Sequence, residues 1–319
     1  MANVLVAGGA GFIGSHLIDR LVERGDSVVC VDNLSTGTRA HTALHSGDQR
    51  YRFVEVDVCE EGMPRLARGS GGCRFDAVMH LASPASPPAY LARPIETLDA
   101  GSIGTRRLLE IARADSARFV LASTSEVYGD PLVHPQNESY NGNVDPVAPR
   151  SVYDEAKRFA EALTMAYART HGVAIGIARI FNTYGPRMRA DDGRVVTNFV
   201  YQALAGEPLT IFGDGSQTRS FCYVDDEVAG LLALLDSHEV GPINIGNPHE
   251  VSIRDFADLV IELTGSSSSV GFQPAPVGDP LVRRPDITLA KRVLGWHPAV
   301  ALRDGLRLTI DDYKSDRAT

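Results

Sequence analysis

Short apolar runs alternate with stretches of helical periodicity through the first half of the chain. The runs are rich in β-branched or aromatic residues and cover Asn3–Ala7, Ser27–Val31, Tyr51–Val56, Phe75–Leu81 and Arg118–Ala122. Helical patterns such as Ser15–Arg24 and Gly104–Ala114 separate them. A further strand, Ala174–Ile180, follows a long helix over Tyr153–His171. Apolar strands that alternate with helices are typical of a parallel sheet covered on both faces, so the pattern predicts a doubly wound α/β fold.

The pattern changes after about Arg179. Turn signals multiply in this half, at Tyr184-Gly185-Pro186, Gly206-Glu207-Pro208, Gly213-Asp214-Gly215 and Gly241-Pro242. We therefore expect residues 1–179 to form the domain that carries the parallel sheet. Residues 180–319 should mostly form a smaller mixed α/β lobe, with residues 220–236 returning to the first domain.

The bulk composition excludes several classes of protein. The chain has 319 residues, 44% of them hydrophobic, and a formal net charge of −9. An acidic chain without a basic stripe is not expected to bind nucleic acid. The four cysteines lie far apart, and no His/Asp/Glu cluster has metal-site spacing, so we expect reduced thiols and no metal. No signal peptide or membrane-spanning run is recognisable, which favours a cytoplasmic protein.

A glycine-rich turn follows the first predicted strand. Gly8, Gly11 and Gly14, with Phe12 and Ile13 among them, open the first helix. The arrangement suits close approach of the backbone to a pyrophosphate and close packing of helix on strand. Alone it is also compatible with a plain tight turn. Strand, turn and helix together favour a Rossmann-type dinucleotide site.

Asp32, at the end of the second strand, indicates which dinucleotide is bound. A carboxylate there accepts hydrogen bonds from a ribose diol and repels a 2′-phosphate, so NAD is preferred over NADP. Small residues that follow it are expected near the same ribose: Asn33, Ser35, Thr36 and Gly37. Asp57 and Val58, after the third strand, are candidates for the adenine. For Asp57 a helix cap is an equally good interpretation.

Tyr153 and Lys157 are candidates for proton transfer. Their spacing of four places them on one face of a helix. A free phenol has a pKa of about 10, and a lysine cation with a positively charged nicotinamide would lower it. Thr124 is expected beside the cofactor, at the carboxyl end of a strand. A surface pair is the alternative interpretation, but such a set suits taking a proton from a sugar hydroxyl while hydride leaves the same carbon.

Several longer stretches resemble one family. They are GGAGFIGSHL, HLASPASPPAY, STSEVYGDP, YDEAKR, RIFNTYGPRM, DGRVV, FGDGSQTRSFCYVDD, RRPDI and LGWHP. Together they resemble the extended short-chain dehydrogenase/reductase family of nucleotide-sugar epimerases, dehydratases and decarboxylases, over nearly the whole chain. HLASPASP, STSEVYGDP and DGRVV are most similar to its UDP-glucuronate decarboxylases. The resemblance implies NAD-dependent conversion of UDP-glucuronate to UDP-xylose through a 4-keto intermediate, with hydride returned to C4, in a homodimer formed through two helices per subunit.

The resemblance also implies roles for further residues. Cofactor contacts are implied for Leu81, Ala82 and Ser83. Contacts to the UDP-sugar, in the second lobe or beside the sheet, are implied for Ser86, Tyr90, Thr124, Glu126, Asn182, Gln217, Arg219 and Arg283. A single arginine is more often an exposed charge. In an acidic protein, however, Arg219 and Arg283 with Arg187 and Arg194 indicate an anion pocket.

Ser125 bears on the type of reaction. The related dTDP-glucose 4,6-dehydratases carry an aspartate at this position. A dehydratase must protonate a departing hydroxide, and a serine is a poor acid, so loss of water is disfavoured. Decarboxylation needs no protonated leaving group. The predicted catalytic set is therefore Thr124, Ser125, Glu126, Tyr153, Lys157 and Arg283.

Glu126 needs a balancing cation if it lies near a substrate carboxylate, because two carboxylates repel each other. Arg283 is the candidate, since the first arginine of RRPDI enters the site in the family that the chain resembles. The alternative interpretation of Glu126 is a carboxylate at the start of a helix.

One stretch departs from the family pattern. Asp99 and Gly101 stand where family members usually carry lysine and asparagine. The change could alter nicotinamide placement, cofactor retention or substrate acceptance. The alternatives to a decarboxylase are another epimerase or 4,6-dehydratase of the family, or a non-catalytic Rossmann protein that senses dinucleotides.

Overall fold

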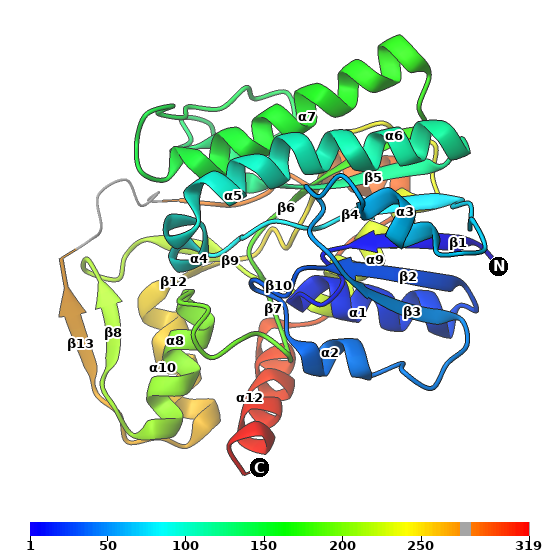
Figure 1. Cartoon of the computed structure of the whole chain (residues 1–319). Coiled ribbons are helices and arrows are strands. Elements are labelled where there is room, and N and C mark those ends of the chain that lie inside the picture. Colours follow the sequence, from blue (N-terminus) through cyan, green and yellow to red (C-terminus); the bar gives the residue numbers. More distant parts are fainter. Residues whose placement is uncertain (275–281, 319) are drawn as a thin grey trace.

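A seven-stranded parallel sheet with helices on both faces forms the larger part of the molecule (Figure 1). The computed structural model describes residues 1–274 and 282–318. In spatial order the strands are β11 (Ile243–Ile245), β6 (Ile175–Ile180), β5 (Arg118–Thr124), β4 (Ala77–His80), β1 (Asn3–Ala7), β2 (Ser27–Asp32) and β3 (Tyr51–Glu55). Every neighbouring pair is parallel, which confirms the predicted sheet.

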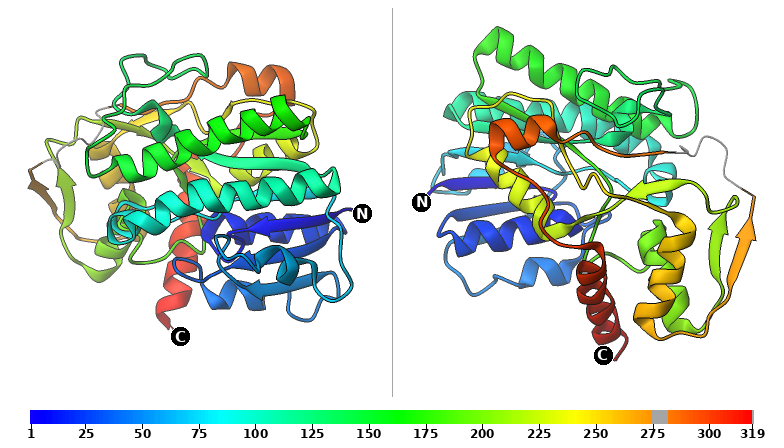
Figure 2. Two further views of the ribbon diagram at one scale, coloured as in Figure 1. Left: turned by 45° about the horizontal axis from the view of Figure 1, so that its top comes forward. Right: turned by 180° about the vertical axis from the view of Figure 1, so that it is seen from behind.

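Side chains alternate between the two faces of the sheet, and each face is covered by its own helices (Figure 2). Val4 and Val6 of β1 pack into a core with α1 (Phe12–Glu23) and α9 (Val224–Leu235). Leu5 and Ala7 point the other way, into a core that includes three helices, α3 (Met63–Arg68), α6 (Thr105–Asp115) and α7 (Ser151–His171). The short elements of this part are α2 (Arg39–Ala43), α4 (Pro87–Ala92), α5 (Pro94–Asp99), the π-helical turn η1 (Ala100–Gly104) and the 3₁₀ turn η2 (Ser125–Tyr128).

A smaller lobe lies beyond the carboxyl ends of the strands. It contains α8 (Val195–Ala205), β8 (Leu209–Phe212), β9 (Thr218–Ser220), β12 (Glu250–Ser252), α10 (Ile253–Thr264) and β13 (Val270–Gln273). β8 pairs with β13 in parallel, and β9 pairs with β12 antiparallel. Helices and strands both contribute to this lobe, as predicted. Phe256 of α10 packs against Phe199 of α8, with ring centroids 5.9 Å apart, and against Phe221, which follows β9, at 4.6 Å. The remaining elements are β7 (Thr183–Tyr184), β10 (Cys222–Tyr223), α11 (Thr288–Leu294) and α12 (Leu302–Ala318).

The observed elements differ from the expected ones at positions that matter for the site. Helix α1 begins at Phe12, three residues earlier than predicted, and β5 extends to Thr124. Residues 224–235 form α9, which packs on the sheet, and β11 adds an edge strand that the sequence pattern did not predict. None of the helices in residues 1–274 and 282–318 is long and apolar enough to span a bilayer.

Candidate active site

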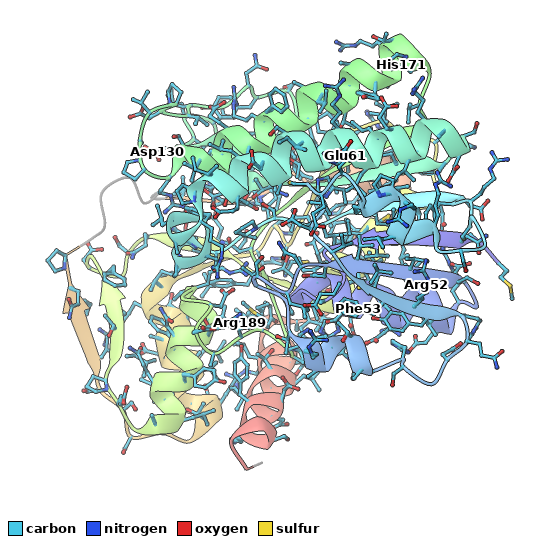
Figure 3. The ribbon with its side chains drawn as sticks, viewed as in Figure 1. Arg52, Phe53, Glu61, Asp130, His171 and Arg189 are labelled. Atoms are coloured by element: carbon cyan, nitrogen blue, oxygen red, sulfur yellow. The ribbon has the colours of Figure 1, made fainter. Side chains whose placement is uncertain are left out.

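A cavity of about 870 Å³ opens at the carboxyl ends of the parallel strands. One wall comes from the turns after β1, β4 and β5, and the other from α8 and the residues around β8 and β9. Arg189, which lines the cavity, lies on the segment between β7 and α8, where the smaller lobe faces the sheet (Figure 3). Ligands of open parallel sheets bind at this edge, so the two parts of the chain can both contact one ligand here.

Two positions at the turn after β1 leave no room for a side chain. Gly8 has a φ of +82°, and a Cβ on it would lie 2.5 Å from the backbone nitrogen of Ala82. A Cβ on Gly14 would lie 2.2 Å from the Gly8 carbonyl oxygen. Because only glycine fits these positions, the backbone itself lines the cavity beside the N-terminus of α1. Such a cradle fits the pyrophosphate of a dinucleotide.

Most of the predicted cofactor residues line the cavity. These are Gly8, Gly11, Phe12, Ile13, Gly14, Ser35, Thr36, Leu81, Ser83, Tyr153 and Lys157. Another group does not line it: Asp32, Asn33, Gly37, Asp57, Val58 and Ala82. These residues belong to the ends of β2, β3 and β4 and the turns that follow them. They lie behind the residues that line this end of the cavity.

Asp32 illustrates this supporting role. Its Oδ2 accepts a hydrogen bond from the backbone N–H of Ala10 over 3.0 Å, and its Oδ1 accepts one from that of Leu34 over 2.8 Å. Burial raises the pKa of Asp32, and these two N–H groups oppose the shift. The carboxylate thus fixes the glycine turn against the end of β2, and each oxygen keeps a lone pair for a ribose hydroxyl.

Asp57 closes a turn and does not cap a helix. Its Oδ1 accepts a hydrogen bond from the backbone N–H of Cys59 over 2.7 Å, and its Oδ2 accepts one from Nδ2 of Asn33 over 2.6 Å. Helix α3 starts only at Met63, so the helix-cap interpretation is wrong. The contact ties the turn after β3 to the turn after β2.

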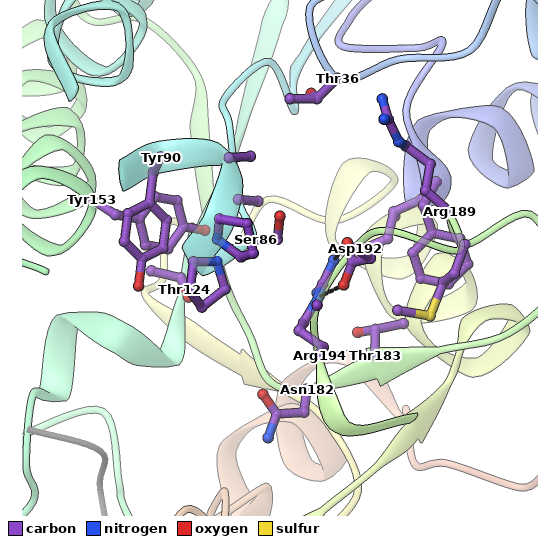
Figure 4. A pocket seen from close by; sticks show the side chains of 18 of the residues that line it. Thr36, Ser86, Tyr90, Thr124, Tyr153, Asn182, Thr183, Arg189, Asp192 and Arg194 are labelled. Atoms are coloured by element: carbon purple, nitrogen blue, oxygen red, sulfur yellow. Dashed lines mark hydrogen bonds and ion pairs between the residues drawn. The ribbon is translucent and has the colours of Figure 1, made fainter. Parts of the chain in front are cut away.

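Tyr153 and Lys157 lie in the first two turns of α7 and are both buried. Lys157 donates from Nζ to the Ala122 carbonyl oxygen over 2.8 Å, and Nζ is 5.8 Å from the centre of the Tyr153 ring. The Tyr153 ring stacks on Tyr90 with centroids 5.2 Å apart (Figure 4). Thr124, the last residue of β5, hydrogen-bonds to Tyr153. The predicted trio is therefore brought together.

Burial dominates the acidity of this trio. It raises the pKa of the Tyr153 phenol, and the hydrogen bond with Thr124 only partly opposes this. Burial also lowers the pKa of Lys157 to about 8, although the nearby Glu161 carboxylate acts to raise it. The Lys157 ammonium group donates to β5. The lower phenol pKa that the sequence predicts also requires a positively charged nicotinamide, and it stays a prediction. A phenolate would need further positive charge from a bound ligand.

Glu126 is held between two arginines. Its Oε2 lies 3.2 Å from Arg150 Nη2, and its Oε1 lies 3.3 Å from Arg283 Nη1. Arg283 is only 3% exposed and also donates to the Gly129 carbonyl oxygen over 3.0 Å and to Ser125 Oγ over 3.4 Å. Burial alone would raise the pKa of Glu126, but the two guanidinium groups hold it below its usual value. One carboxylate and two cations leave a net positive charge at this end of the cavity.

Sequence reasoning missed Arg150 as a member of this site. It is the residue at the start of α7, three positions before Tyr153. A cation at a helix N-terminus is unfavourable with the helix dipole, and this was the available signal that something else holds it. Glu126, 24 residues earlier, is that partner.

Asp154 is a second residue that sequence reasoning missed. It lies next to Tyr153 and is 8% exposed, and its Oδ1 has no hydrogen-bond partner among the described residues. Burial and the nearby Glu126 carboxylate raise its pKa to about 7, while Arg150 and Arg283 act in the opposite direction. Asp154 is thus a buried acid that can change its charge near neutral pH.

The predicted sugar-nucleotide residues line the other end of the cavity: Ser86, Tyr90, Thr124, Glu126, Asn182, Gln217, Arg219 and Arg283. Gln217 also has a structural contact, because its Nε2 donates to the Phe212 carbonyl oxygen over 2.6 Å. Arg219 donates from Nη1 to the Thr218 carbonyl oxygen over 2.9 Å. Of the further arginines, Arg187 pairs with Asp19 at 2.8 Å and Arg194 with Asp192 (Figure 4).

No group of three or more His, Cys, Asp or Glu side chains that could hold a metal occurs within residues 1–274 and 282–318. The four cysteines are unpaired. His80 is buried, hydrogen-bonds through Nε2 to Thr105 Oγ1 at 3.0 Å, and has its pKa lowered by burial to about 3. It is a packed neutral residue.

The doubly wound sheet, the glycine cradle and the Thr124, Tyr153 and Lys157 set define a Rossmann-type protein of the short-chain dehydrogenase/reductase class. Comparison with known proteins makes this specific. Residues 4–246 match the NAD dependent epimerase/dehydratase family, and the chain belongs to that family.

Individual relatives extend the comparison to nearly the full chain. The chain is 51% identical to UDP-glucuronic acid decarboxylase 4 of Arabidopsis thaliana over 312 residues, which cover 98% of the chain and 68% of that protein. Among solved structures, UDP-glucose 4-epimerase of Thermotoga maritima has a TM-score of 0.91 at 33% identity, with 99% of each chain covered. UDP-glucuronic acid 4-epimerase of Bacillus cereus, in complex with UDP-glucuronic acid and NAD, has a TM-score of 0.86 at 31% identity, with 98% of this chain and 99% of that one covered.

Proposed function

We propose that this protein is an NAD-dependent decarboxylase that converts UDP-glucuronate to UDP-xylose. The observation that carries the proposal is the Arg150, Glu126 and Arg283 cluster beside Thr124. The positive charge of its two arginines suits a sugar that carries a carboxylate. The 51% identity to a plant UDP-glucuronic acid decarboxylase supports the same assignment.

The residues of the site divide the work of binding NAD and the sugar. The glycine cradle would receive the pyrophosphate, and Ser35, Thr36 and Asp32 lie at the end where the adenosine ribose would bind. NAD, when bound, would supply the acceptor and later the donor of a hydride at C4 of the sugar. Asp32 disfavours a 2′-phosphate, so we propose a preference for NAD over NADP.

Tyr153 takes the proton from the C4 hydroxyl, with Thr124 hydrogen-bonded beside it. When the carboxylate leaves as carbon dioxide, the electrons of the C5–C6 bond move into the sugar as an enolate, whose C5 takes up a proton from water before hydride returns to C4. Tyr153 and Thr124 then face the negative charge on O4 and stabilise it by hydrogen bonds. Arg283 and Arg150 orient the departing carboxylate, and Ser125 supplies no acid that could expel a hydroxide.

Product analysis tests the proposal. The purified protein is incubated with UDP-glucuronate and NAD, and the products are followed by mass spectrometry. We expect a nucleotide sugar lighter by carbon dioxide, with no net change in NAD, and no product with Tyr153→Phe. A product of unchanged mass would assign an epimerase, loss of water a dehydratase, and no reaction a non-catalytic protein. Each of these results would overturn the proposal.

We propose further that the enzyme is a cytoplasmic homodimer. The unpaired cysteines are consistent with a reducing compartment. Apolar side chains are exposed on two neighbouring helices, Phe159 of α7 by 51% and Ile95 of α5 by 64%, which supports an interface that includes both helices. Light scattering on the purified protein should give twice the chain mass of 34.3 kDa. A single chain mass at micromolar concentration would refute the dimer.

A further inference from the structure

The π-helical turn η1 lies against the catalytic helix at Gly101. This turn links α5 to α6, both of which run along α7 (Figure 1). Gly101 is buried, and a Cβ on it would lie 2.6 Å from the Ala156 carbonyl oxygen and 2.8 Å from the Ala156 Cβ. Non-bonded carbon atoms normally stay about 3.5–4.0 Å apart. Because the nearest atom belongs to the backbone, no change of rotamer relieves the overlap.

Ala156 occupies a sensitive place on α7. It adjoins Lys157 and lies three residues after Tyr153, within the same two helical turns. Lys157 is tied to β5 through the Ala122 carbonyl oxygen, and the Tyr153 ring is tied to Tyr90. A displacement of α7 at Ala156 therefore moves both reactive side chains relative to the cavity.

A second glycine fixes the opposite side of the same turn. A Cβ on Gly104 would lie 2.7 Å from Cγ2 of Val58, in the turn after β3. The next residue, Thr105, is fully buried and hydrogen-bonds to His80. The turn η1 is thus packed between α7 and the turn after β3, and a side chain at Gly101 can be accommodated only if α7 and η1 move apart.

We propose that Gly101 is a positioning residue for Tyr153 and Lys157, because its bare backbone sets how closely α7 approaches the rest of the sheet domain. The proposal also accounts for the departure at this position, since an asparagine side chain would have no space beside Ala156. Measuring kcat depends on the proposed decarboxylation, so the test includes a second readout that is independent of this activity.

The test compares Gly101→Ala with Gly62→Ala, a control in which the new methyl group meets no atom within 4 Å and the backbone φ of −76° suits alanine. A shift of about 1 Å in a reacting group costs on the order of 10²-fold in rate. Gly101→Ala should therefore lower kcat for UDP-glucuronate by about 10- to 100-fold, with a change in KM of less than about threefold. It should also displace the pH–kcat profile, because Tyr153 meets Thr124 differently. Gly62→Ala should leave kcat, KM and the pH–kcat profile unchanged.

The second readout follows the tyrosine itself. With 3-fluorotyrosine incorporated at position 153, Gly101→Ala should move the ¹⁹F resonance and Gly62→Ala should not. A kcat within twofold of the unmodified enzyme, or a lower kcat with an unmoved ¹⁹F resonance and pH profile, would overturn the proposal. If the unmodified protein does not act on UDP-glucuronate, the proposed function fails, while the ¹⁹F comparison still decides the role of Gly101.

A reverse pair of variants covers the case that Gly101→Ala does not fold. Ala156→Gly removes the facing methyl group, and Ala162→Gly places the same substitution on the exposed side of α7. We expect Ala156→Gly to lower kcat at least fivefold and to move the ¹⁹F resonance, relative to Ala162→Gly. Equal behaviour of the two variants would overturn the proposal.

Discussion

Glu126 is an ionised carboxylate that pairs with two arginines of the site. Arg150 and Arg283 hold its two oxygens, so it limits the positive charge of the site while staying ionised. Glu126→Gln keeps the shape and removes the charge. We expect kcat for UDP-glucuronate to fall by about 10²-fold with little change in KM, because the proposed contact to the diphosphate comes from a different residue, Arg219.

Steady-state kinetics measures this effect, with Glu155→Gln as the control. Glu155 lies on α7 but outside the cavity lining, in a half-exposed pair with Arg158. A Glu126→Gln variant with normal kcat and raised KM would reduce Glu126 to a binding residue.

Asp154 should make the stability of the fold depend on pH. Its pKa rises from 3.8 to about 7 on folding, so the folded state binds a proton more tightly than the unfolded chain. Stability from this group is therefore full below about pH 4 and is lost as the pH rises to about 7. Asp154→Asn, which cannot ionise, should gain stability over the unmodified protein, and the gain should be about 2–3 kcal/mol larger at pH 8 than at pH 5.

Urea unfolding at the two pH values measures this difference. Comparing the two proteins at each pH cancels the titration of all other groups. An equal gain at both pH values would mean that Asp154 does not titrate with a raised pKa.

At the scale of elements, a buried ion pair joins α7 to β6. Arg179 Nη2 lies 2.8 Å from Glu161 Oε2, and both side chains are less than 15% exposed. Glu161 also accepts a hydrogen bond from Ser123 Oγ over 2.6 Å, so it links β5 as well. Removing one partner leaves a buried charge, which costs about 3–5 kcal/mol.

We therefore expect Arg179→Ala to lower the free energy of unfolding by about 3–5 kcal/mol. Arg303→Ala is the control, because its pair with Glu262 is 43% and 60% exposed and should contribute less than about 1 kcal/mol. Chemical unfolding of both variants measures the two losses in the free energy of unfolding. Similar losses would show that the Arg179 pair contributes no more than a surface pair.

The sequence predicted those elements that have a strong local pattern. The first six strands, the glycine turn and the Tyr153 and Lys157 helix all follow from periodicity or spacing within one segment. Strand β11 was missed because three residues are too short for a recognisable pattern. The Arg150 contact and the Gly101 contact were missed for another reason. Each joins segments far apart in the chain, and only their packing brings them together.

At the scale of the whole molecule, the division into a domain of residues 1–179 and a second lobe stays a prediction. Helix α9 lies in the stretch that we expect to return to the first domain, whereas β11 packs on the sheet although it falls among residues assigned to the second lobe. A fragment of residues 1–179 would expose the apolar face that Val228, Leu231 and Leu234 cover, each at most 1% exposed. We expect this fragment to aggregate, or to lack a cooperative thermal transition that the full chain shows. A soluble fragment with a cooperative transition would support the boundary.

The position of β11 has a consequence for biosynthesis. Chains emerge from the ribosome N-terminus first, and β6 is complete well before its edge partner has been translated. During that interval the nascent polypeptide carries an open strand edge, the kind of surface that pairs with other chains. Stalled nascent chains that have β6 outside the ribosomal exit tunnel but β11 still inside it should therefore recruit a chaperone more strongly than chains long enough to expose both strands.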